Sequence, residues 1–263
     1  MKKLIDTLAH PTVSGTWLDK KDYNASIEKL VNELKKSPFT HAFAVGLPNM
    51  DGYSNRMFFN MCDEYDELIP IAGLDVNQDL DLVMRDLEEI VDEGFNGIKI
   101  HPRFSYMNYE KNYLDIIFKY AAENELVVFY CTYPHCSAPN YPEVDPFYSL
   151  VKVINQNPHT KLILVHGGVT DILKYAELAR FNDNILLDLS LTIMKYPDSS
   201  VDSDLKFLFN NFDRKITIGT DWPEYKHKDV YERVLHFSKG VSQDKLDNIF
   251  YKNINNFHNF IIE

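Results

Sequence analysis

The stretch LIDTLAH at residues 4–10 decides the fold, because it reads as a buried strand that delivers His10 at its carboxyl end. Seven more apolar runs of similar length follow along the chain, at residues 40–47, 68–75, 96–101, 126–131, 161–166, 184–190 and 215–221. The runs are apolar on both faces, which is typical of parallel strands that are covered on both sides. Segments with the spacing of amphipathic helices, such as 27–34 and 80–90, separate the runs.

Eight strands that are each followed by a helix predict a (β/α)8 TIM barrel, with residues 1–263 as a single domain. An open, doubly wound sheet is the alternative fold. That fold usually has a glycine-rich first turn, and the stretch PTVSG at residues 11–15 is not one. Asn77 or Asp79 is the expected N-cap of the helix over residues 80–90.

Composition and charge limit the classes of partner. The 39 acidic residues outnumber the 27 basic ones and give a net charge of −12, which would repel a nucleic acid. No apolar run approaches the roughly 18 residues that cross a membrane. The amino-terminal apolar run is too short for a signal peptide, and three cysteines do not form a disulfide framework. We therefore expect a cytoplasmic protein with a small-molecule substrate. Whether the chain forms a homo-oligomer is left open by the sequence.

Residues able to do chemistry stand at the ends of the predicted strands. Six of the eight runs finish on such residues, namely His10, Asp75, His101, Cys131, His166 and Asp221. The active site of a TIM barrel lies at the carboxyl ends of its strands. Because side chains alternate along a strand, Asp6, Leu8 and His10 should share one face, as should Lys99 and His101. The sequence therefore predicts that these side chains converge at the barrel mouth.

Three of the strand-end residues are the main candidates for the site, although each has a structural alternative. Asp221 is costly to bury unless it meets a cation or accepts a proton, but it could also cap the following turn. His166 precedes two glycines that leave room for a ligand, or that serve only the strand-to-helix turn. His10 could instead donate a hydrogen bond to a loop carbonyl.

Other polar residues leave more alternatives open. An inward-facing Lys99 needs a counter-charge, which could be a substrate acid, Asp188 or Asp221, or it could be carbamylated and bridge two metals. His101 could bind substrate or lie in the loop before Pro102. Asp188 and Ser190 share a face of the seventh run. They could orient substrate or a metal-bound water, or form a hydrogen-bonded polar layer.

A sulfur ligand and a covering loop complete the candidate site. Cys131 could bind zinc as a thiolate or pack as a small hydrophobic residue, and His135 and Cys136 are further possible ligands. The aromatic, proline-rich loop at residues 133–147 is expected to cover the site, where it could stack on a sugar or an aromatic ring, or to form an interaction surface. The candidate substrate-binding residues are Lys99, His101, Arg103, Tyr133 and Trp222.

The ordered motifs LIDTLAHP, GIKIHPR, LILVHGG and TIGTDWP resemble the amidohydrolase superfamily, and in particular its amidohydrolase 2 branch. Residues 246–254 resemble the terminal helix of that branch. The resemblance implies a divalent metal ion, with zinc as the first candidate, and matches His10, His166 and Asp221 to metal-binding positions. The sequence departs from the family pattern where Leu8 and Cys131 replace two histidines.

Three functions remain open at this point. The first is a metal-dependent hydrolase of a small, possibly sugar-derived, amide, ester or lactone. In it, His166 stabilises the oxyanion and Asp221 shuttles the proton. The second is a metal-free lactonase or lyase that uses Asp221 and His166. The third is a degenerate barrel that binds a ligand or a partner without chemistry.

Overall fold

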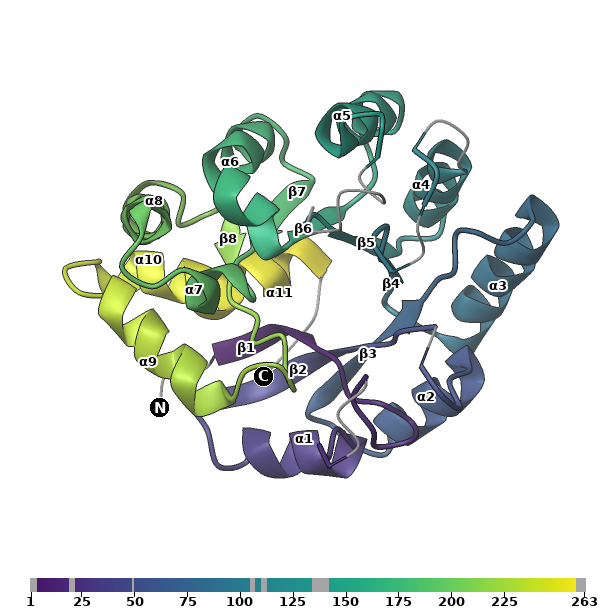
Figure 1. The fold of residues 1–263 in the computed structure, drawn as a ribbon, viewed down its shortest axis with the longest axis horizontal. Coiled ribbons are helices and arrows are strands. Elements are labelled where there is room, and N and C mark those ends of the chain that lie inside the picture. The colour runs from purple at the N-terminus through teal and green to yellow at the C-terminus, as the bar shows by residue number, and fades with distance from the viewer. Residues whose placement is uncertain are drawn as a thin grey trace.

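The computed structural model describes residues 4–18, 22–48, 50–104, 107–109, 113–133 and 142–258. Within them, eight parallel strands form one sheet in the order of the sequence (Figure 1). The strands are β1 (Leu4–Ala9), β2 (Phe39–Val45), β3 (Leu68–Gly73), β4 (Gly97–Ile100), β5 (Val127–Cys131), β6 (Leu162–Val165), β7 (Ile185–Asp188) and β8 (Ile216–Thr217). Each lies within or overlaps one of the eight predicted runs, so all eight predicted strands are confirmed.

Backbone hydrogen bonds between the segment that follows β8 and strand β1 close the sheet into a ring. Thr7 N donates to Ile218 O at 3.0 Å, and Asp221 N donates to Leu8 O at 2.8 Å. His10 N then donates to Trp222 O at 2.6 Å. This pairing confirms the predicted (β/α)8 barrel and brings the first and last strand ends side by side.

Helices surround the strands as an outer layer (Figure 1). They are α1 (Ile27–Leu34), α2 (Asn55–Asp63), α3 (Leu80–Glu93), α4 (Leu114–Glu123), α5 (Pro146–Gln156), α6 (Ile172–Arg180), α7 (Thr192–Lys195), α8 (Ser200–Asn211), α9 (His227–Phe237), α10 (Gln243–Asp247) and α11 (Asn253–His258). Asp79, rather than Asn77, is the N-cap residue of α3. Among the described residues, no helix has the length and apolarity needed to cross a bilayer.

An irregularity in β1 corrects one expectation from the strand alternation. The register of β1 against β2 shifts between Asp6 and Ala9, and Asp6 Oδ1 accepts a hydrogen bond from Leu8 N at 3.1 Å. As a result, Leu8 and Thr7 both face the barrel interior, where Thr7 Oγ1 donates to Asp188 Oδ2 at 2.6 Å. Asp6 faces outward toward α9 instead. The prediction that Asp6 shares a face with Leu8 and His10 was therefore wrong.

Candidate active site

A cavity of about 240 Å³ opens at the carboxyl ends of the strands. It is lined by His10, Trp17, Leu18, Leu47, His101, Arg103, Phe104, Tyr133, His166, Leu191, Lys195, Asp221, Glu224 and Tyr225. The structure thus brings six of the predicted site residues to one cavity, namely His10, His101, Arg103, Tyr133, His166 and Asp221.

His10 is oriented by the neighbouring strand. Its Nδ1 lies 2.9 Å from Val45 O, and because a carbonyl only accepts, Nδ1 carries the proton. The free Nε2 then lies 3.6 Å from Asp221 Oδ1. The indole of Trp17 stacks on the imidazole at 6.1 Å between ring centroids. Burial and the nearby charge of Lys99 lower the pKa of His10 to about 3, so the ring is neutral at physiological pH.

His166 is oriented by the polar layer beneath the cavity. Its Nδ1 lies 2.9 Å from Ser190 Oγ and 3.2 Å from Ser190 O, so Nδ1 again carries the proton and Nε2 is free. Ser190 Oγ in turn donates to Asp188 Oδ1. Asp188 and Ser190 do not line the cavity, so they form the hydrogen-bonded layer that was one of their two expected roles. Burial and the charge of Lys99 hold the pKa of His166 well below its usual range.

The backbone after His166 makes an unusual turn that fixes the imidazole. His166, Gly167, Gly168 and Val169 all have φ between 56° and 82°. Thr132 Oγ1 accepts a hydrogen bond from Gly168 N at 2.7 Å and holds the turn. A side chain at Gly168 would collide with the ring of Tyr175. The two glycines therefore serve the turn, and the turn places His166 at the cavity.

Asp221 also has a left-handed backbone, with φ at 57°. Burial raises the pKa of its carboxyl to about 7, although the charge of Lys99 acts in the opposite direction. A carboxyl with a pKa near neutrality can both accept and return a proton, which suits a general acid–base. The geometry of Asp221 is consistent with that use because its Oδ1 faces the cavity residue His10.

Lys99 lies inside the barrel and is only 1% exposed. Its Nζ has no hydrogen-bond partner among the described residues. Burial lowers the pKa of Lys99, while the charges of Cys131, Asp221 and Asp188 raise it. The side chain does not line the cavity but lies close enough to lower the pKa of all three cavity histidines. Lys99 therefore lies beneath the cavity and interacts electrostatically with the cavity histidines and with Asp221.

Arg103 supplies a second cation at the cavity wall. Its guanidinium lies over the rings of Phe104 and Tyr133, at 4.8 and 4.6 Å from their centroids. Arg103 Nε is buried and has no hydrogen-bond partner within the described part of the chain. The ammonium group of Lys195 lies 5.2 Å from the ring of Tyr133. His101 stacks on Phe104 at 4.0 Å. This wall combines cations with aromatic faces.

Three predicted site residues do not line the cavity, namely Lys99, Trp222 and Cys131. Trp222 lines a different pocket on the outer side of the barrel, where its Nε1 donates to Glu33 Oε2 at 3.0 Å. The left-handed turn at Asp221 directs the next side chain outward, so Trp222 does not line the cavity. Cys131 packs in an apolar cluster with Val169 and Leu191. The expected ligands His135 and Cys136, and most of the covering loop, lie outside the described residues.

Several cavity residues were missed by sequence reasoning. They are Trp17, Phe104, Lys195, Glu224 and Tyr225. All of them follow strand ends in the chain, so the loops after the carboxyl ends of the strands were the available signal. Asp75 was counted among the strand-end residues able to do chemistry. Its side chain accepts a hydrogen bond from Asn77 N at 3.0 Å and holds a turn.

Comparison with known proteins agrees with this architecture. A family model described as amidohydrolase matches residues 20–257. The chain belongs to the amidohydrolase family. A search of curated proteins finds no match. On the strength of the family, the chain is an enzyme of the amidohydrolase superfamily.

Solved structures with a similar fold include both hydrolases and decarboxylases. An uncharacterised TIM-barrel protein from Bordetella bronchiseptica has a TM-score of 0.77 at 18% identity, covering 97% of this chain and 98% of its own. A protein from Acinetobacter baumannii, assigned as a 2-pyrone-4,6-dicarboxylic acid hydrolase and holding citric acid, has a TM-score of 0.70 at 18% identity, covering 99% and 100%. The 5-carboxyvanillate decarboxylase of Sphingomonas paucimobilis has a TM-score of 0.71 at 10% identity, covering 99% and 100%.

Within the described residues, the donor set of this amidohydrolase does not fit the metal ion that its motifs imply. A catalytic zinc site usually has three protein ligands. Among the described residues, no three histidine, cysteine, aspartate or glutamate side chains are placed to hold a metal ion. Leu8 occupies one expected ligand position with an apolar side chain, and Cys131 packs among apolar residues.

Proposed function

We propose that this enzyme hydrolyses an ester, lactone or amide of a small carboxylated compound, and that Lys99 supplies the positive charge that a resident metal would otherwise provide. The observation that carries the proposal is the buried Nζ of Lys99, which has no hydrogen-bond partner among the described residues. An unpaired buried cation is costly, so its retention near Asp221 fits a site that receives negative charge during the reaction.

The cavity wall supports a carboxylated substrate. The buried Nε of Arg103 needs an acceptor, and a carboxylate is the acceptor that a guanidinium matches best. Lys195 adds a second positive charge beside Tyr133, whose ring can stack on a planar substrate. The structural neighbour from Acinetobacter baumannii holds citric acid, itself a carboxylated small molecule. We therefore place the substrate carboxylate against Arg103 and its reacting carbonyl nearer Asp221.

The hydrogen bonds of His166 define its role in the reaction. With the proton on Nδ1, His166 offers Nε2 as an acceptor, so it orients the attacking water rather than stabilising the oxyanion as the sequence suggested. Asp221 accepts a proton from that water as the oxygen bonds to the carbonyl carbon. Lys99 does not line the cavity, so it stabilises the negative charge on the carbonyl oxygen electrostatically, from beneath the cavity. When the bond to the leaving group breaks, Asp221 returns the proton to that group.

The test is a panel of small carboxylated lactones, esters and amides, assayed with enzyme that has been dialysed against a chelator. We expect hydrolysis of at least one compound, unchanged by the chelator or by added zinc. Lys99→Met should lower kcat/KM by about 100-fold, whereas the exposed control Lys119→Met should not change it. Activity that is lost with the chelator and restored by zinc would favour the metal-dependent hydrolase. Release of carbon dioxide would show a decarboxylase.

A further inference from the structure

The left-handed backbone at Asp221 has to be held in place. A φ of 57° is uncommon for a residue other than glycine and persists only when the surroundings enforce it. Both neighbours of Asp221 in the chain are therefore informative. Thr220 and Trp222 are each buried, and each is bonded to a different carboxylate on the outer side of the barrel.

Asp6 holds the residue before Asp221. Its Oδ1 accepts a hydrogen bond from Thr220 N at 2.8 Å, and its Oδ2 accepts one from Thr220 Oγ1 at 2.6 Å. Asp6 is fully buried, so both bonds form out of contact with water. Thr220 Oγ1 also accepts a hydrogen bond from Trp222 N at 3.0 Å, which spans Asp221. The backbone on the amino-terminal side of Asp221 is thus tied to β1.

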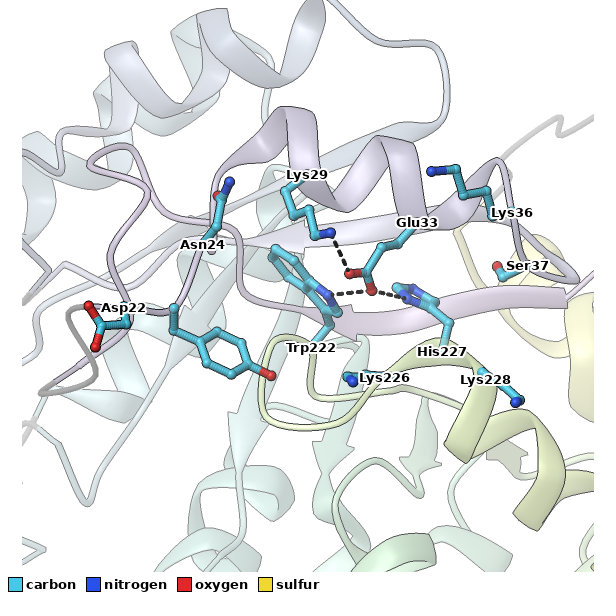
Figure 2. Close-up of a pocket in the computed structure, with 11 residues that line it drawn as sticks. Asp22, Asn24, Lys29, Glu33, Lys36, Ser37, Trp222, Lys226, His227 and Lys228 are labelled. Carbon is cyan, nitrogen blue, oxygen red and sulfur yellow. Dashed lines mark hydrogen bonds and ion pairs between the residues drawn. The ribbon is translucent and has the colours of Figure 1, made fainter.

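Glu33 of α1 holds the residue after Asp221. Its Oε2 accepts the hydrogen bond from Trp222 Nε1 at 3.0 Å (Figure 2). Lys29 lies 3.4 Å from the other oxygen, Oε1. A carboxylate on a surface helix thereby fixes an indole that is only 2% exposed, next to the acid–base residue.

His227, the first residue of α9, joins the two carboxylates. Its Nε2 lies 3.0 Å from Asp6 Oδ2, and its Nδ1 lies 3.7 Å from Glu33 Oε2. Figure 2 shows the imidazole beside Glu33, with Trp222 on the other side of that carboxylate. Phe39 of β2 packs its ring edge against His227 and adds no charge. The imidazole of His227 thus lies at ion-pair distance from two carboxylates, without a hydrogen bond of good geometry to either, and each carboxylate holds one neighbour of Asp221.

We infer that Asp6, His227 and Glu33 are positioning residues that act as a charged clamp on Asp221, and that loss of the proton from His227 loosens the clamp. The importance of this clamp for catalysis rests on the proposed role of Asp221, but its geometry does not. Burial opposes the charge on His227, yet the two carboxylates outweigh it and raise the pKa of His227 to about 8. The clamp should therefore be closed at neutral pH and should weaken above it.

The other ionisable groups around His227 do not duplicate its role. They line the outer pocket of about 470 Å³, and they are Asp22, Tyr23, Lys29, Lys36, Lys226 and Lys228. The four lysines are exposed, and the ion pairs of His227 within the described residues are with Asp6 and Glu33. A change in the clamp near pH 8 is accordingly assigned to His227.

The experiment follows the indole resonance of Trp222 by ¹H–¹⁵N NMR between pH 6 and 10. The chain has only two tryptophans, so Trp222→Phe identifies the resonance by its loss. We expect the resonance to shift with a midpoint near pH 8 in the wild type and to stay constant in His227→Gln. The exposed His236 lies on the same helix, so His236→Gln is the matched control and should titrate as the wild type does.

Two further measurements keep the inference falsifiable. The ¹³Cγ resonance of Asp221, identified with Asp221→Asn, should show its own step near pH 7 and a second step near pH 8 that is absent in His227→Gln. If His227→Gln does not fold, Glu33→Gln replaces it, because the amide still accepts from Trp222 while the lost charge should lower the midpoint. A Trp222 resonance that does not titrate, or that titrates unchanged in both variants, would overturn the clamp.

Kinetics separate this inference from the proposed function. On any hydrolysed compound, His227→Gln should lower kcat by about 10-fold with KM within about two-fold, as expected for misplacement of an acid–base group. If Asp221 proves to have no part in turnover while the resonances titrate as described, the proposed function fails and the clamp stands. If hydrolysis requires Asp221 but kcat is unchanged in His227→Gln, the clamp fails alone.

Discussion

The inside of the barrel mouth and the outside of the β1–β8 junction carry buried charge in opposite ways. Inside, Lys99 Nζ and Arg103 Nε have no hydrogen-bond partner within the described residues. Outside, the charge of His227 lies between the carboxylates of Asp6 and Glu33. Nδ1 and Nε2 of His227 also lack a hydrogen bond of good geometry within the described residues, so the two regions differ in their ion pairs, since His227 has carboxylate oxygens 3.0 and 3.7 Å away. We propose that the inside receives an anion, whereas the outside already holds its counter-charges.

Two histidines show the same contrast on the scale of one side chain. His166 and His227 are both buried, at 3% and 2% exposure. His166 bonds only to Ser190 through Nδ1 and lies near Lys99, and its pKa falls well below the usual range. His227 has two carboxylates beside it, and its pKa rises to about 8. Burial alone therefore does not set the charge of a histidine here, since the neighbouring charges decide it.

The largest effect should come from removing the carboxyl that faces the cavity. Asp221→Asn should lower kcat by about 1000-fold, because the amide can neither accept nor return a proton. Asparagine tolerates the left-handed backbone at this position, so the melting temperature should barely change. Asp75→Asn is the control, because that carboxylate only holds a turn and its loss should leave turnover intact. Full activity in Asp221→Asn would exclude the mechanism.

On the outer side of the barrel, removing a carboxylate should lower the free energy of unfolding. Asp6→Asn removes one of the two carboxylates beside His227 while keeping an oxygen for Thr220 N. Breaking a buried ion pair from one side should lower the free energy of unfolding by about 3 kcal/mol at pH 6. Urea denaturation measures this value. A loss below about 1 kcal/mol would mean that Asp6 and His227 do not form a stabilising buried ion pair.

The corresponding change inside the barrel should leave stability nearly unaffected. Lys99→Met replaces the unpartnered ammonium with an apolar group of similar length. The free energy of unfolding should stay within about 1 kcal/mol of the wild type or increase, since no pair is broken. The same urea experiment compares it directly with Asp6→Asn. A loss as large as that of Asp6→Asn would show that Lys99 is a structural ion-pair partner and would remove the contrast between the two regions.

Much of the inner region could be predicted from the sequence, because it depends on short-range patterns. Apolar runs locate the strands, and barrel geometry brings their carboxyl ends together, which places His10, His166 and Asp221 at one cavity. The exceptions come from local backbone turns. Asp6 faces outward because β1 shifts register, and Trp222 faces outward because Asp221 has a positive φ. Neither shift follows from residue alternation.

The outer region was not predictable in the same way. Glu33 and His227 are 194 positions apart and lie on helices whose apolar faces give no sign of the contact. Their meeting depends on the closure of the barrel, which brings α1 and α9 together beside β1. The sequence also offered no means to decide between ligand and hydrophobic roles for Cys131, since that choice depends on its packing against Val169 and Leu191.

A pH dependence of stability should also belong to the outer region. The pKa of His227 is raised from 6.5 to about 8 on folding. The stabilisation is therefore fully present below pH 6.5 and is lost as the pH rises through 8, and it amounts to about 2 kcal/mol. Urea denaturation at pH 6 and pH 9 measures the loss. The difference between wild type and His227→Gln isolates it, because the contributions of Asp221 and Lys99 are common to both proteins. An equal loss in the two proteins would place the titrating charge inside the barrel rather than in the clamp.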